Sequence, residues 1–144
     1  MVTYDDIVKF MEEYFVAFSE YGQVPESQPV MDKYYAPDLS IDDGFINGRE
    51  RWYKAMLSHP DIKDILVADH LFIDESQKEV GVLVRTQYVK RSTGEMLIEL
   101  KMNVLYSLRI DNDDIKITKF RVYVESDADK LSRMWQLFRK PQKT

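Results

Sequence analysis

Two histidines, 25 acidic residues and no cysteine define the acid–base chemistry that this sequence could perform. Without cysteine the chain has no thiolate nucleophile, no disulfide and no cysteine-bound zinc or iron–sulfur cluster. The two histidines do not form a pair at helical or strand spacing, so we expect no metal site. Histidine, aspartate and tyrosine remain as groups that could move a proton without a metal or another cofactor.

His70 lies in a stretch that alternates between apolar and polar residues, and Leu66, Ala68 and Phe72 share its register. If these neighbours face inward, His70 faces inward too, because alternate residues of a strand point to the same face. An inward histidine could act as an acid or base, or it could be a hydrogen-bonded core residue. His59 precedes a proline at the predicted end of a helix, where a cation suits the helix dipole, so we interpret it as structural.

Aromatic residues recur on the apolar faces of the predicted elements and could line a cavity for a flat hydrophobic molecule. They could equally form a simple core. The set comprises Tyr14, Tyr34, Tyr35, Trp52, Phe72, Tyr88 and Tyr106. We take as candidate substrate-binding residues Tyr35, Trp52, Phe72, Tyr106 and Asn103. Asn103 lies on the polar face of a predicted strand, and that face could also be solvated or form a dimer contact.

The spacing of apolar residues divides the chain into helices and strands. A period of three to four predicts helices, and a period of two predicts strands. The predicted helices cover residues 4–22, 27–36, 48–58 and 128–138. The predicted strands cover residues 39–42, 62–74, 79–91, 95–110 and 114–125. In the last strand the apolar positions change parity near Thr118 and Lys119, which predicts a β-bulge.

Helices that precede a run of long strands indicate the α+β class. Strands this long need strong twist or bulges to stay compact. We therefore expect a curved antiparallel sheet wrapped around the N-terminal helices, followed by a C-terminal helix. A cavity is expected between the concave face of the sheet and the helices. No repeat or change in composition divides the chain, so we expect one domain over residues 1–144.

The composition is that of an ordinary globular domain, with 144 residues of which 44% are hydrophobic and 31% charged. A formal net charge of -5 argues against a nucleic-acid-binding surface. No apolar run approaches the roughly 20 residues that cross a membrane, and the N-terminus lacks the features of a signal peptide. We expect a cytoplasmic protein that binds neither nucleic acid nor membrane.

Two short motifs carry a resemblance to a known family. The run Tyr34–Asp43 reads YYAPDLSIDD, and Asn47–Glu50 reads NGRE at the start of a predicted helix. Together with the order of elements, these motifs resemble the nuclear-transport-factor-2-like superfamily, which includes ketosteroid isomerase, scytalone dehydratase and the SnoaL-type polyketide cyclases. The resemblance implies a cone-shaped, cystatin-like α+β barrel with a pocket at its open end, and a homodimer formed through the sheet.

The resemblance also implies catalytic roles for three side chains. Asp43 corresponds to the proton-shuttling carboxylate of ketosteroid isomerase, and Tyr14 corresponds to its oxyanion-binding tyrosine. His70 is similar to the strand histidine of scytalone dehydratase. An aspartate in an apolar cavity has a raised pKa and can take a proton from a carbon next to a carbonyl. Asp43 also precedes Gly44, a sequence typical of a turn.

The sequence leaves two functions open. One is a cofactor-independent lyase or isomerase, with Asp43 and His70 as proton carriers and Tyr14 as hydrogen-bond donor, acting on a small hydrophobic or aromatic molecule. Residues 101–106 lack the aspartate that gives ketosteroid isomerase its second oxyanion donor, which speaks against the steroid reaction itself. The other is a non-catalytic ligand-binding or dimeric interaction module, because a fold alone does not imply chemistry.

Overall fold

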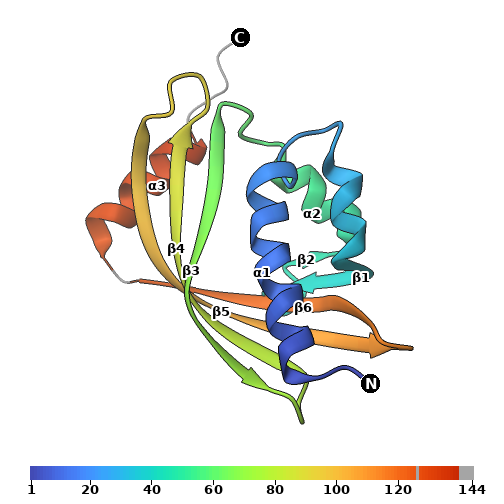
Figure 1. The fold of residues 1–144 in the computed structure, drawn as a ribbon. Helices are drawn as coiled ribbons and strands as arrows, with labels where there is room; N and C mark the ends of the chain where they lie inside the picture. The colour runs from blue at the N-terminus through green and yellow to red at the C-terminus, as the bar shows by residue number, and fades with distance from the viewer. Residues whose placement is uncertain (126, 140–144) are drawn as a thin grey trace.

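The computed structural model describes residues 1–125 and 127–139, and Figure 1 shows its helices and strands. The helical segments are α1 (Tyr4–Tyr21), the 3-10 helix η1 (Gln28–Lys33), α2 (Arg49–Met56) and α3 (Ala128–Arg139). The strands are β1 (Tyr35–Ile41), β2 (Ile46–Asn47), β3 (Ile62–Asp74), β4 (Glu79–Lys90), β5 (Met96–Asp111) and β6 (Asp114–Val124). The α+β class is confirmed, and β1 is longer than the strand predicted over 39–42.

α1 begins with a capping box. The Asp6 amide donates to the Thr3 hydroxyl oxygen at 3.2 Å, and the Thr3 amide donates to the Asp6 carboxylate at 2.9 Å. These bonds satisfy amide groups that the first turn would leave without partners. The helix then buries one stripe of side chains against the sheet: Ile7, Met11, Tyr14, Phe15, Ala17 and Phe18. This stripe sets the direction in which Tyr14 points.

The strands form one curved, unclosed sheet in the order β2-β1-β6-β5-β4-β3. β3 to β6 form an antiparallel meander, as predicted. β1 pairs in parallel with β6, so the sheet is mixed rather than wholly antiparallel. A parallel pair needs a long connection rather than a hairpin, and β1 and β6 are separated in the chain by α2 and four strands. β2 and β3 are the edges of the sheet.

The bulge predicted in the last strand is confirmed. Lys119 pairs with Ser107, whereas Ile117 pairs with the next residue of β5, so Thr118 is the extra residue of β6. Because of the extra residue, odd-numbered side chains face the core before the bulge and even-numbered side chains face it afterwards. Ile117 and Phe120 can therefore both be buried in the same core, although one number is odd and the other even.

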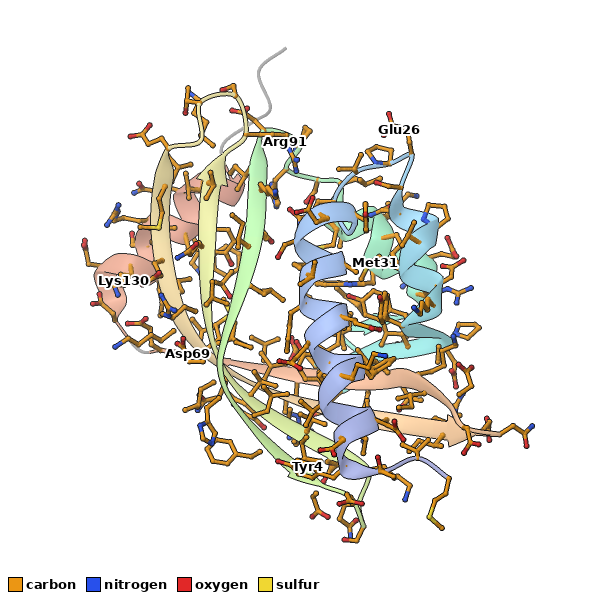
Figure 2. The ribbon with its side chains drawn as sticks, viewed as in Figure 1. Tyr4, Glu26, Met31, Asp69, Arg91 and Lys130 are labelled. Carbon is orange, nitrogen blue, oxygen red and sulfur yellow. The ribbon has the colours of Figure 1, made fainter. Side chains whose placement is uncertain are left out.

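The main core fills the space between α1 and the concave face of the sheet (Figure 2). Three tyrosines are among its largest fully buried side chains: Tyr14, Tyr35 and Tyr106. Farther along β4 and β5, Met134 and Leu137 of α3 pack against a second, smaller cluster. Among the helices of residues 1–125 and 127–139, none combines the length and apolarity that crossing a bilayer requires.

Candidate functional site

A pocket of about 450 Å³ lies between the helices and the inner face of the sheet. This volume is within the range of sites for small molecules. Its aromatic lining consists of Tyr14, Phe18, Trp52, Tyr88, Tyr106 and Phe120. Its polar lining consists of Asp42, Ser58, His59, Asp64 and Thr86. Aliphatic side chains and methionines complete the wall, so the pocket is largely apolar with a few polar groups.

A more voluminous hollow, of about 790 Å³, lies between α3 and β5. Its described lining residues include no aspartate, glutamate, histidine or tyrosine. They are Leu97, Ile98, Ser132, Arg133, Trp135, Gln136 and Leu137. The described lining of this hollow therefore offers no such acid–base group, and the smaller pocket is the candidate site.

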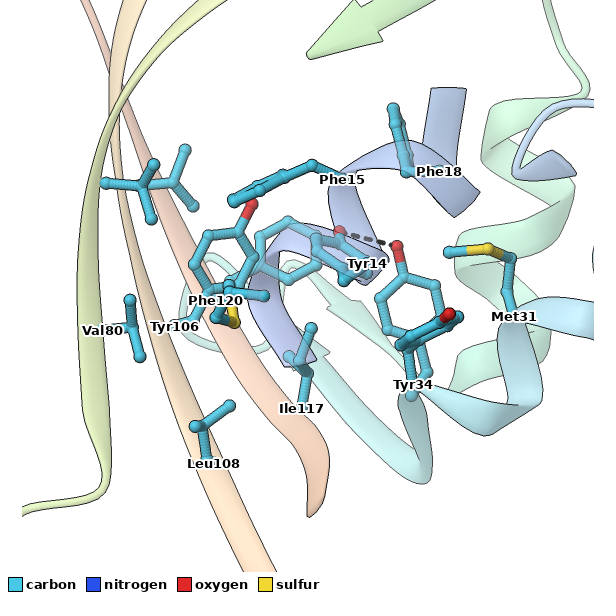
Figure 3. Packing of buried hydrophobic residues seen from close by; sticks show 14 of the residues in the cluster. Tyr14, Phe15, Phe18, Met31, Tyr34, Val80, Tyr106, Leu108, Ile117 and Phe120 are labelled. Atoms are coloured by element: carbon cyan, nitrogen blue, oxygen red, sulfur yellow. Dashed lines mark hydrogen bonds between the residues drawn. The ribbon is translucent and has the colours of Figure 1, made fainter. Parts of the chain in front are cut away.

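A chain of hydrogen bonds supports Tyr14 at the pocket wall. The Trp52 indole Nε1–H donates to the Tyr35 hydroxyl oxygen at 3.2 Å, and the Tyr35 and Tyr14 hydroxyls are 2.8 Å apart. Figure 3 shows the bond of Tyr14 as a dashed line, with the ring of Tyr106 on its other side. An indole N–H can only donate, so Tyr35 accepts from Trp52 and can pass its own hydrogen to Tyr14. In this orientation the Tyr14 hydroxyl can donate to Tyr106, its second hydrogen-bond neighbour, or to a molecule in the pocket.

The buried tyrosines are uncharged at neutral pH. Burial raises the pKa of Tyr14 well above its usual value, and the neighbouring Tyr106 and Tyr35 raise it further. Burial likewise raises the pKa of Tyr35 and of Tyr106. These phenols therefore act as hydrogen-bond donors rather than as bases.

Asp64 is a half-buried carboxylate on the pocket wall, near the start of β3. Its backbone is held on both sides by one buried side chain, Gln23. The Asp64 amide donates to Gln23 Oε1 at 2.6 Å, and Gln23 Nε2 donates to the Asp64 carbonyl at 3.1 Å. The Leu66 amide donates to Ser19 Oγ at 3.2 Å. Because β3 is an edge strand, these side chains replace a neighbouring strand and fix the position of Asp64.

The carboxyl group of Asp64 has acid–base properties unlike those of a surface aspartate. Burial raises its pKa to about 7, against an opposing effect of the positive charge of Arg91. Within residues 1–125 and 127–139, its carboxylate makes no hydrogen bond and no ion pair. A carboxyl group in this state titrates near neutral pH, as a general acid or base must.

His59 is a second titratable group of the same pocket, in the connection from α2 to β3. Burial lowers its pKa, so its imidazole is neutral at neutral pH. Its sequence had indicated only a structural role at a helix end. In the part of the chain that the structure describes, no cluster of three histidine, aspartate or glutamate side chains could hold a metal ion.

No protein-family profile matches this sequence, and no curated protein matches it. Solved structures do match. A SnoaL-like polyketide cyclase from Agrobacterium tumefaciens aligns over 93% of this chain and 98% of its own, with a TM-score of 0.62 and 12% identity. A nuclear-transport-factor-2-like protein of unknown function from Cytophaga hutchinsonii aligns over 87% and 92%, with a TM-score of 0.55 and 18% identity. This chain has the nuclear-transport-factor-2-like fold.

The nuclear-transport-factor-2-like fold also serves proteins that are not named as enzymes. A computationally designed 17-OHP binder aligns over 83% of this chain and 92% of its own, with a TM-score of 0.61 and 17% identity. At these identities the likeness shows the fold and not the activity. The resemblance found in the sequence is thus confirmed at the level of the fold.

The structure places Asp43 outside the pocket, so its expected position is wrong. Asp43 is exposed and forms an ion pair with Arg121. Asp42, Asp43 and Gly44 all have positive φ, of 50°, 56° and 91°, as a tight turn requires. The turn directs Asp42 rather than Asp43 to the pocket, where it also accepts a hydrogen bond from the Val122 amide at 2.9 Å.

His70 and Phe72 are also outside the pocket, and the prediction that they face inward is wrong. Ala68 pairs with Val84, but His70 pairs with the next residue of β4, so Asp69 is an extra residue in β3. This bulge reverses the alternation of the strand. His70 and Phe72 are therefore exposed, with their rings 4.4 Å apart.

The remaining candidates divide between the pocket wall, the core behind it and the outer surface. Tyr14, Trp52 and Tyr106 line the pocket. Tyr35 does not line it and supports Tyr14 from behind. Asn103 is exposed on the outer face of β5, away from the pocket.

Two functional candidates were missed in the sequence, Asp64 and His59. Asp64, Leu66 and Ala68 are alternate residues of β3 and therefore point to the same face. Leu66 and Ala68 were expected to face inward, so the same pattern could have predicted that Asp64 does. His59 lies in a connection, where no periodic pattern exists. Its place on the wall depends on how the chain leaves α2.

Proposed function

We propose that this protein binds a small, largely apolar molecule in the pocket and transfers a proton on it as a cofactor-independent lyase or isomerase. The observation that carries the proposal is the Asp64 carboxyl group on the wall of a largely apolar pocket. Because no side chain among the described residues bonds this carboxylate, it is available to a bound molecule. Asp64 takes the role that the sequence had suggested for Asp43.

The chemistry follows from the groups on the wall. The Asp64 carboxylate takes a proton from a carbon next to a carbonyl, and the electron pair of that C–H bond forms an enolate. The Tyr14 hydroxyl donates a hydrogen bond to the enolate oxygen, and one such donor contributes about 3 kcal/mol. The proton then returns to another carbon in an isomerase, or to a departing hydroxyl that leaves as water in a lyase.

The pocket supports this scheme in two further ways. The chain from Trp52 through Tyr35 favours a Tyr14 hydrogen directed away from Tyr35, so the donor is oriented before a molecule binds. Neutral His59 provides a second group that can accept or return a proton.

Exchange of carbon-bound protons in heavy water tests the proposal. Aryl-substituted cyclic ketones such as 4-phenylcyclohexanone are incubated with the protein, and exchange next to the carbonyl is followed by NMR. We expect exchange above the buffer rate that increases with pH through about 7, because the base is ionised Asp64. Asp64→Asn should reduce the protein-dependent rate by about 100-fold or more.

Asp61→Asn is the matched control, because Asp61 is exposed in the connection before β3 and does not line the pocket. It should leave the exchange rate unchanged. Exchange that persists in Asp64→Asn would refute the role of Asp64, and no exchange with any ketone would refute the reaction.

The second candidate function is a non-catalytic binding module. It is favoured by the outward positions of Asp43 and His70, which leave fewer acid–base groups in the pocket than the sequence had suggested. The designed binder of the same fold supports it as well. Ketone binding without exchange above the buffer rate is the result that separates this function from catalysis.

We also propose that two copies associate through the outer face of the sheet. Three large apolar side chains on neighbouring strands of this face are exposed to solvent: Phe72, Leu83 and Leu105. Exposed apolar groups that lie together are typical of protein–protein contacts.

A further inference from the structure

The pocket wall has acidic and neutral groups without a cation among its described lining residues. Apart from the tyrosines, the ionisable groups among the described lining residues are Asp42, Asp64 and neutral His59, with no lysine or arginine. Arg91 acts on Asp64 from outside this lining, near the end of β4 (Figure 2), where its Nε–H donates to the Pro60 carbonyl at 3.1 Å. A carboxylate or phosphate ligand would therefore enter a pocket without a counter-charge and would face like charges.

Among the residues that the structure describes, none gives the carboxylate of Asp64 the hydrogen bond or ion pair that an ionised group needs in an apolar setting. Gln23 binds the backbone of Asp64 and not its carboxylate. An ionised group without a partner is costly where water is largely excluded, and a bound cation offsets that cost. A cationic ligand would thus complete an ion pair of which the protein contributes only one half.

The aromatic wall adds a second attraction for a cation. Trp52, Tyr88, Tyr106 and Phe120 line the pocket, and the faces of aromatic rings attract positive charge. Because the indole N–H of Trp52 already donates to Tyr35, a ligand does not have to accept a hydrogen bond from this ring. The chain as a whole has a formal charge of -5, which also favours a positive ligand.

We propose that the molecule bound in this pocket is a basic amine, with an aromatic or alicyclic frame against the apolar wall and an ammonium group paired with Asp64. This inference rests on the proposed function only in that the pocket is the ligand site, because a carboxylate paired with an ammonium group binds the ligand and does not at the same time take a proton from carbon. It adds a charge requirement to a site otherwise defined by its size and apolarity.

The proposal has a pH signature. Burial holds the pKa of Asp64 at about 7, so part of the free protein carries a neutral carboxyl group at neutral pH. The ammonium group binds the ionised form, and affinity should rise about tenfold per pH unit below that pKa and level off above it. Of the other groups near Asp64, burial and Asp64 raise the pKa of Tyr88, burial lowers the pKa of His59, and the positive charge of Arg91 opposes the effect of burial on Asp64.

Three probes of similar shape and different charge test the inference. They are 4-phenylpiperidine, which is cationic, 4-phenylcyclohexanone, which is neutral, and 4-phenylcyclohexanecarboxylate, which is anionic. Binding is measured by calorimetry at pH 6, 7 and 8 with the wild type, Asp64→Asn and the control Asp61→Asn. We expect the amine to bind at least tenfold more tightly than the ketone at pH 8, and the carboxylate to bind most weakly.

Asp64→Asn should reduce amine affinity at pH 8 by about tenfold or more, remove its pH dependence and leave ketone affinity within about threefold. Equal affinity for amine and ketone, tight binding of the carboxylate, or an unchanged amine affinity in Asp64→Asn would each overturn the inference. Proton exchange in the ketone reports separately on the proposed function. Exchange without amine preference refutes only the amine, and amine preference without exchange refutes only the reaction.

Discussion

Aspartates on the outer surface are exposed and paired with arginines, whereas Asp64 in the pocket is desolvated. Three outer aspartates each pair with an arginine of a long strand: Asp38 with Arg109, Asp43 with Arg121 and Asp69 with Arg85. Hydrogen bonds from these arginines hold the pKa of Asp38 and of Asp69 below the usual value. In the pocket, burial raises the pKa of Asp64 to about 7.

The difference shows why residue type alone does not identify a site. An exposed carboxylate beside an arginine stays ionised. The ion pair adds little to the stability of the fold, because water screens the two charges. A desolvated carboxylate without a partner is held in a costly state that a ligand or a proton relieves. The inner face of the sheet therefore holds the reactive aspartate, and the outer face holds paired ones.

The largest expected difference between the two faces is in the free energy of unfolding, and two leucines of β5 should reveal it. Leu100 is fully buried on the inner face, whereas Leu105 is 38% exposed on the outer face. Leu100→Ala should lower the free energy of unfolding by about 3 kcal/mol, because it leaves a cavity. Leu105→Ala should change it by less than about 0.5 kcal/mol. Urea unfolding at low protein concentration measures both, and similar losses would show that the two faces are not distinct.

A smaller contrast is expected in the pH dependence of stability. The folded-state pKa of Asp64 is raised from 3.8 to about 7, so its contribution favours folding at low pH and is lost as pH rises from about 4 to 7. Asp64→Asn removes this loss and should be more stable than the wild type at pH 8 by about 2 kcal/mol, after allowance for partial exposure.

Asp69→Asn is the matched variant on the outer face. Arg85 lowers the pKa of Asp69, so its contribution is lost only as pH falls through the acid range. Thermal unfolding at pH 5 to 8 should show no new pH dependence in Asp69→Asn. A rise in stability at pH 8 in this variant as well would mean that a general charge effect, not the pocket, explains the result for Asp64.

The weakest expected effect concerns association through the outer face. If two copies associate through Leu105 and its neighbours, the sedimentation coefficient of the wild type should increase with concentration toward that of a dimer. Leu105→Arg should shift this transition to at least tenfold higher concentration, because it places a charge in the contact. Val16→Arg, on the exposed side of α1, is the control. A wild type that stays monomeric at all concentrations would remove the proposed interface.

The fold could be predicted from the sequence because long elements repeat their pattern many times. The bulge in β6 was visible because apolar residues on both sides of Thr118 mark the change of parity. The bulge in β3 was missed because the residues around it, Asp69 and His70, are both polar. Leu71 and Ile73, which continue the buried side beyond the bulge, were the available signal.

The candidate site was less predictable than the fold. Tyr14, Trp52 and Tyr106 belong to periodic stripes, and the structure places all three on the pocket wall. Asp43 was placed by resemblance to a motif, but the direction of its side chain depends on the positive φ angles of a turn. Such local geometry leaves little trace in a pattern of apolar and polar residues.

The way in which Gln23 and Ser19 bind the edge of β3 has a consequence beyond the pocket. An edge strand normally offers its amides to solvent or to a strand of another molecule. The amide of Leu66 instead donates to Ser19 of α1, and the amide of Asp64 donates to Gln23, two residues beyond the end of that helix. These two amides should exchange slowly with heavy water despite their place at the rim of the sheet, and this part of β3 is closed to strand addition and the aggregation that follows from it.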